Sequence, residues 1–155
     1  MTVSLDLEIQ RVCSDGDQPS DDDLRLWSRA AVAGRRAAAE MVIRIVDEAE
    51  ISDLNREYRN RDRPTNVLSF PFEAPPELPH GLAGDLIGDL VICAPVVRRE
   101  AAEQGKGLQA HWAHMVVHGV LHLLGYDHIE DADALVMEGL ETDIMNGLGY
   151  PDPYQ

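Results

Sequence analysis

Histidines are concentrated in one short stretch of this chain, and their spacing constrains the local fold more than any other feature. Five of the six histidines fall within residues 111–128. His118 and His122 are four residues apart, so on a helix their imidazoles share one face and can bind a single ion through nitrogen bonds of ~2.0–2.1 Å. Gly125 can then end the helix in the left-handed conformation and return His128 to the same ion. The pattern predicts a helix, a glycine turn and a divalent metal site, with zinc as the expected ion.

Three neutral nitrogen ligands leave a fourth coordination position open, which is typical of catalytic rather than structural zinc. His114 is a rival ligand because it continues the same stripe, but it lies about 12 Å along the helix axis from His122, too far for all three to share one ion. His111 and His114 are therefore expected to support the ligands, to face the substrate, or to be partly buried without a catalytic role. His80 is expected to be exposed. The alternative for the ligand trio is a set of histidines packed on an apolar helix.

The spacing His-x-x-x-His-x-x-Gly-x-x-His also occurs in the metzincin peptidases, where a glutamate after the first histidine is the general base. Here Gly119 stands at that position. The sequence therefore predicts the metal scaffold without the proteolytic base, and a zinc metallopeptidase with an unusual base is the lesser alternative.

Hydrophobic patterning predicts a single α/β (α+β) domain over residues 1–155, in which one sheet of about four strands packs with about five helices and the metal site lies on a late helix. Alternating or continuous apolar runs predict strands in residues 3–9, 41–46, 66–70 and 86–93. Capping residues, prolines and glycines predict helices from the Ser20 cap toward Gly34, from the Ser52 cap to just before Arg61, from Pro95 to Gln104, over 108–124 and over 131–146. The proline-rich segment of residues 71–81 is the longest predicted loop.

The formal net charge of −15 argues against a surface that binds nucleic acid everywhere, because phosphate binding depends on positive side chains. Residues 53–63 are the exception, with four arginines against three acids. An anionic ligand is expected to dock there, although a solvated face with ordinary ion pairs is the alternative. With two cysteines, no apolar run of membrane-spanning length and an acidic N-terminal segment, the chain is expected to be a cytoplasmic protein without disulfides or a membrane partner.

Longer motifs give the chain a family resemblance. His118-Gly-Val-Leu-His-Leu-Leu-Gly-Tyr-Asp-His128 is similar to the signature of the YbeY family of bacterial endoribonucleases, and Arg63-Pro-Thr-Asn-Val-Leu-Ser-Phe-Pro-Phe72, Gly88-Asp-Leu-Val-Ile-Cys93 and Leu148-Gly-Tyr-Pro-Asp-Pro-Tyr154 resemble the rest of it. The resemblance extends from about Met41 to the C-terminus. It implies one zinc ion, or another divalent metal, per chain on His118, His122 and His128.

The resemblance also implies a function and partners. A metal-dependent, single-strand-specific endoribonuclease is expected, acting in 16S rRNA 3′-end maturation and ribosome quality control. The implied partners are rRNA and the ribosome or its associated proteins, with no DNA partner expected. By its Tyr-Arg context, Arg59 matches an arginine important for RNA cleavage. Apart from the resemblance, His114 and Asp89 are weak candidates for proton transfer, and a structural role is the expected one for each. The alternative from another class is a non-catalytic ribosome-assembly factor stabilised by its metal.

Overall fold

A four-stranded sheet forms the centre of the molecule. The structure, a computed structural model, describes residues 3–72, 84–127 and 130–154. Strands β1 (Ser4–Arg11), β2 (Ala38–Val46), β3 (Val67–Pro71) and β4 (Leu86–Cys93) lie in the order β1-β2-β4-β3. The β1–β2 and β2–β4 pairs are parallel, whereas β3 runs antiparallel to β4 at the edge of the sheet.

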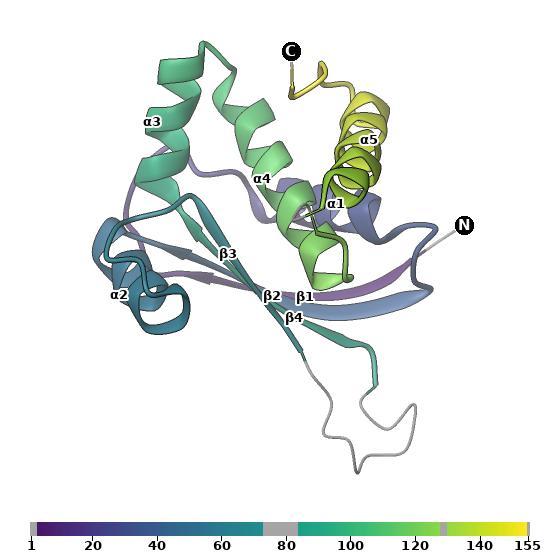
Figure 1. The fold of residues 1–155 in the computed structure, drawn as a ribbon, viewed down its shortest axis with the longest axis horizontal. Coiled ribbons are helices and arrows are strands. Elements are labelled where there is room, and N and C mark those ends of the chain that lie inside the picture. Colours follow the sequence, from purple (N-terminus) through teal and green to yellow (C-terminus); the bar gives the residue numbers. More distant parts are fainter. Residues whose placement is uncertain (1–2, 73–83, 128–129, 155) are drawn as a thin grey trace.

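Five helices flank this sheet in the described part of the chain: α1 (Asp21–Val32), α2 (Glu48–Arg59), α3 (Ala94–Gln104), α4 (Leu108–Leu123) and α5 (Asp131–Gly147). Helices α1, α4 and α5 lie over one face of the sheet, and α2 lies on the other side (Figure 1). Helix α4 contacts α1, α3, α5, β3 and β4, so it is the central helix of the fold. The predicted α/β class, with one sheet and five helices, is confirmed.

Two apolar clusters hold these layers together. The larger one joins the α1–α4–α5 side to the sheet through fully buried side chains such as Trp27, Trp112 and Leu90. The smaller one packs Ile51 of α2 against Val91 on the opposite sheet face. No helix in the described ranges is both long enough and apolar enough to cross a membrane.

The predicted start of the second helix is wrong. Helix α2 begins at Glu48, and the carboxylate of Asp47 caps it by accepting the backbone N–H of Glu50 at 3.0 Å. Ser52, the predicted cap, lies inside the helix. The other predicted cap, Ser20, does accept the backbone N–H of Asp23 at 3.1 Å, as expected for the start of α1.

The other boundaries differ by a few residues. Strand β2 starts at Ala38, three positions before the predicted strand, because backbone pairing with β1 continues there. The run predicted to be covered on both faces, β4, is buried except near Leu86 and Asp89. Most of the predicted proline-rich loop, including His80, lies outside the described residues.

Candidate metal centre and cleft

Helix α4 is oriented by its close approach to strand β4. A Cβ atom at Gly119 would lie 2.7 Å from Cδ2 of Leu90, so only glycine fits at the present distance between helix and strand. Gly119 therefore faces the sheet, and it is buried. A glutamate at this position, as in the metzincin peptidases, would point into the apolar core, so the structure offers no place for that general base.

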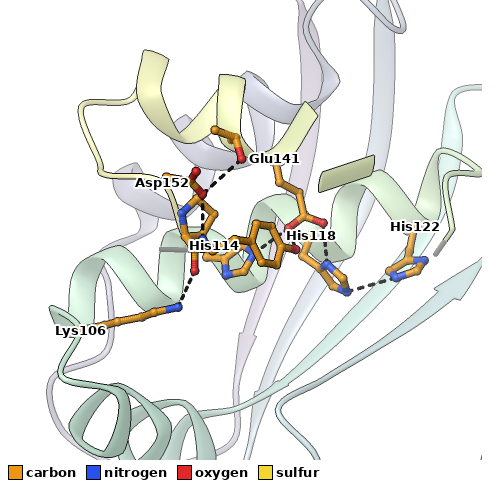
Figure 2. A network of polar contacts seen from close by, with 9 residues as sticks. Lys106, His114, His118, His122, Glu141 and Asp152 are labelled. Atoms are coloured by element: carbon orange, nitrogen blue, oxygen red, sulfur yellow. Dashed lines mark hydrogen bonds and ion pairs between the residues drawn. The ribbon is translucent and has the colours of Figure 1, made fainter. Parts of the chain in front are cut away.

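His118 and His122 lie on one face of α4, as the spacing predicted. Their Nε2 atoms are 3.2 Å apart, and the two imidazoles meet edge to face (Figure 2). Two nitrogens bound at ~2.0–2.1 Å to one tetrahedral ion are about 3.3 Å apart, so this separation fits a shared zinc ion. Both residues are only partly buried, and both line the cleft described below.

A glycine turn follows α4, again as predicted. Gly125 adopts a left-handed backbone conformation with φ of +103°, and its N–H donates to the carbonyl oxygen of His122 at 3.0 Å. The expected third ligand, His128, lies outside the described residues, so its place at the ion stays a prediction.

A buried carboxylate lies behind the histidine pair, and sequence reasoning missed it. Glu141 of α5 is 1% exposed. Its Oε1 is 2.9 Å from Nδ1 of His118, its Oε2 is 2.6 Å from Nε2 of His114, and the hydroxyl of Tyr154 donates to the same Oε2 (Figure 2). Burial raises the pKa of Glu141, but the hydrogen bonds from His114, His118 and the Tyr154 hydroxyl outweigh that effect and lower it to about 2. The carboxylate is therefore ionised at neutral pH.

The His114, His118 and Glu141 side chains form a second arrangement that could hold a metal, because they offer ligand atoms that all lie within 4.8 Å of one another. The two arrangements share His118, whose ring presents Nδ1 to Glu141 and Nε2 to His122. The Nε2 edge of the His118 ring therefore faces the partly buried His122, and the Nδ1 edge faces the fully buried Glu141.

The basic segment and the histidine pair line the same cleft. Its volume is about 860 Å³, and its lining includes Arg59, Arg61, Arg63, His118 and His122. The predicted anion-docking segment, distant in sequence from the histidines, is thus brought to them by the fold. Positive charge and potential metal ligands therefore face one space.

Local structure explains how these arginines reach the cleft. Asn60 ends α2 in a left-handed conformation with φ of 56°, which turns the chain back toward β3. The buried Asn55 holds the turn by donating to the carbonyl oxygen of Arg63 at 3.0 Å. Arg59 donates a long hydrogen bond of 3.4 Å to the carbonyl oxygen of Ser69 on β3, and Ser69 Oγ donates to the carbonyl oxygen of Gly119 at 3.2 Å.

The lesser candidates do not line this cleft. His114 is buried and engaged with Glu141, and His111 is buried with its Nε2 3.0 Å from Glu100. Asp89 lies on the α2 side of the sheet, in a hollow that it shares with Tyr58. The sheet separates the Asp89 side chain from the histidines, which favours a structural role over proton transfer in the site.

Comparisons with known proteins identify the family of this chain. The model of the family described as "Endoribonuclease YbeY" matches residues 20–149. The chain belongs to the YbeY endoribonuclease family. The solution structure of TM1509 from Thermotoga maritima is similar to this YbeY-family protein, with a TM-score of 0.60 and 25% sequence identity over 96% of this chain and 99% of that one. The resemblance predicted from the motifs is confirmed, and the family places the chain among nucleases that act on RNA.

Proposed function

We propose that this YbeY-family protein is a zinc-dependent endoribonuclease that cleaves single-stranded rRNA at the cleft between α2 and α4. The observation that carries the proposal is the convergence of Arg59, Arg61 and Arg63 with His118 and His122 on one open space. A single-stranded RNA brings a negatively charged phosphate at every nucleotide, and the cleft presents positive charge beside candidate metal ligands.

His118 and His122, joined by His128, would hold the zinc ion. When bound, the ion supplies a Lewis acid that polarises a phosphate oxygen. Arg59 reaches the cleft from the end of α2, and its planar guanidinium can hold the scissile phosphate through two parallel hydrogen bonds. Arg61 and Arg63 are positioned to bind neighbouring phosphates and so to fix the direction of the strand.

His114 contributes indirectly in this scheme. Its Nε2 contacts Glu141, and it does not line the cleft, which supports a role through that carboxylate rather than contact with RNA. We further propose that residues 1–155 form one hydrolase domain, and that its substrate is the 3′ end of 16S rRNA during ribosome maturation and quality control. The protein would then act in the cytoplasm with ribosome-associated partners.

A matched pair of arginine variants tests the proposal. Arg59→Ala is expected to lower cleavage of a labelled single-stranded RNA by about 100-fold or more, since removing one preorganised charge donor from a transition state has effects of that size. Arg56→Ala is the control, because Arg56 lies on the same helix but is exposed, paired with Asp53 and Asp62, and outside the cleft lining. Both variants should retain the metal content of the unchanged protein, measured by elemental analysis.

Each alternative function predicts a different result with the same set of purified proteins. Equal cleavage by the Arg59 and Arg56 variants would contradict the role of Arg59. RNA cleavage that survives in a His118→Ala, His122→Ala double variant would indicate a contaminating nuclease and favour the non-catalytic assembly factor. Hydrolysis of an unfolded protein substrate, with no cleavage of RNA, would favour the peptidase.

A further inference from the structure

The carboxylate of Glu141 receives three hydrogen-bond donors from two parts of the chain. His114 and His118 approach from α4 (Figure 2), and the hydroxyl of Tyr154 in the C-terminal segment donates the third hydrogen bond. At these distances each imidazole donates a hydrogen bond to a carboxylate oxygen through the ring nitrogen that faces it. For His118 that nitrogen is Nδ1, and Nε2 is the atom directed toward His122.

The C-terminal segment is fastened to the body of the protein around this point. Lys106 donates to the carbonyl oxygen of Pro153 at 2.7 Å, and Pro153 is buried. The carboxylate of Asp152 accepts the backbone N–H of Tyr154 at 2.8 Å. It also accepts a long hydrogen bond of 3.4 Å from the hydroxyl of Thr142 on α5. The Tyr154 ring stands edge-on to His114, with centroids 5.4 Å apart. These contacts hold the tyrosine hydroxyl over Glu141.

Metal-binding histidines generally donate their second ring N–H to a carboxylate or carbonyl group, which fixes the tautomer and the ring orientation. We propose that Glu141 is the positioning residue for His118, and that the C-terminal segment completes this support through Tyr154. The inference rests on the proposed metal site. The affinity of the site for its ion then depends on Glu141 and Tyr154, which do not touch the ion.

Binding of Co²⁺ tests this role, because its absorption bands report both affinity and the set of ligands. Glu141→Gln replaces the carboxylate with an amide of the same shape, and we expect Co²⁺ binding to weaken by about 10- to 100-fold, the usual effect of losing such a partner. Tyr154→Phe removes a single hydroxyl that contacts the carboxylate and not the histidine, so we expect a smaller loss, of less than about 10-fold. Tyr150→Phe is the matched control in the same segment, because its hydroxyl makes no hydrogen bond to Glu141 in the described part of the chain.

The proposal requires that the absorption bands keep their positions in both variants while the affinity falls. Thermal unfolding of the metal-free proteins shows whether each variant folds, and Tyr154→Phe keeps the test decisive if Glu141→Gln does not fold. Shifted bands in Glu141→Gln would make Glu141 a direct ligand and overturn the positioning role. Unchanged affinity in a folded Tyr154→Phe would overturn the part given to the C-terminal segment.

Failure of the inference can be told apart from failure of the proposed function. Tight Co²⁺ binding and RNA cleavage by the unchanged protein, with equal Co²⁺ affinity in Glu141→Gln, would overturn only the inference. Absence of Co²⁺ binding by the unchanged protein would overturn the metal site and the inference together.

Discussion

Substitution of Gly119 by alanine tests the packing that directs the histidine pair into the cleft. The added methyl group would lie 2.7 Å from Cδ2 and 3.1 Å from Cδ1 of Leu90, a side chain that is fully buried. Overpacking of this kind costs about 1–3 kcal/mol, while the better helix propensity of alanine returns about 1 kcal/mol. Gly119→Ala should therefore lower the free energy of unfolding by about 1 kcal/mol. If Leu90 is first shortened to alanine, at a cost of about 2–5 kcal/mol, the methyl group gains room and the same substitution should become stabilising.

Urea denaturation of the four proteins in this double-mutant cycle gives the coupling. Trp27 and Trp112 are both 1% exposed, so their fluorescence reports loss of the core. We expect a coupling of about 1–3 kcal/mol between positions 119 and 90, whereas residues that do not touch would be additive to within about 0.5 kcal/mol. Additivity, with Gly119→Ala stabilising in both backgrounds, would refute the close packing of α4 on β4. The packing that orients His118 and His122 toward the cleft would then be contradicted as well.

Three further predictions concern other parts of the fold. Gly88 has a φ of +139°, and a Cβ atom there would lie 2.2 Å from the carbonyl oxygen of Phe70. Gly88→Ala should therefore lower the free energy of unfolding, measured by urea denaturation, by about 3 kcal/mol. An unchanged free energy of unfolding would contradict the path of β4. The hydrogen bond from His111 lowers the pKa of Glu100. The stability advantage of the unchanged protein over Glu100→Gln should therefore be complete above the ordinary glutamate pKa and be lost as the pH falls through the lowered pKa; a difference that stays constant across this acid range would contradict it. Burial raises the pKa of the Cys93 thiol to about 11, so little reactive thiolate is present at neutral pH. Alkylation of Cys93, followed by mass spectrometry, should be at least about 100-fold slower in the folded than in the unfolded protein. Equal rates would show that the thiol is accessible.

Local signals in the sequence were sufficient for most elements of the fold. Alternation predicted β1, the Ser20 cap predicted the start of α1, and Pro95 in the first turn predicted α3. The start of α2 was mispredicted because two capping residues compete there. Asp47 follows β2 directly and is succeeded by Glu50 in a capping-box pattern, which was a sufficient signal for the earlier start.

The site was predictable where its residues are close in sequence and less so where the fold brings them together. The spacing of His118 and His122 gave their common face because a helix repeats locally. Glu141 is 23 residues from His118, and no local rule joins the two. One signal was present: Glu141 lies on α5 between the buried Met137 and Ile144, and a glutamate within an apolar helix face generally has a buried partner.

Every role proposed for the cleft depends on His118 and His122 holding one ion. Native mass spectrometry of protein loaded with zinc and then dialysed measures this directly, by comparing the unchanged protein with the folded His118→Ala, His122→Ala double variant. We predict one zinc ion per chain in the unchanged protein and none in the variant. A folded double variant that retains one ion per chain, or an unchanged protein that retains none, would contradict the account.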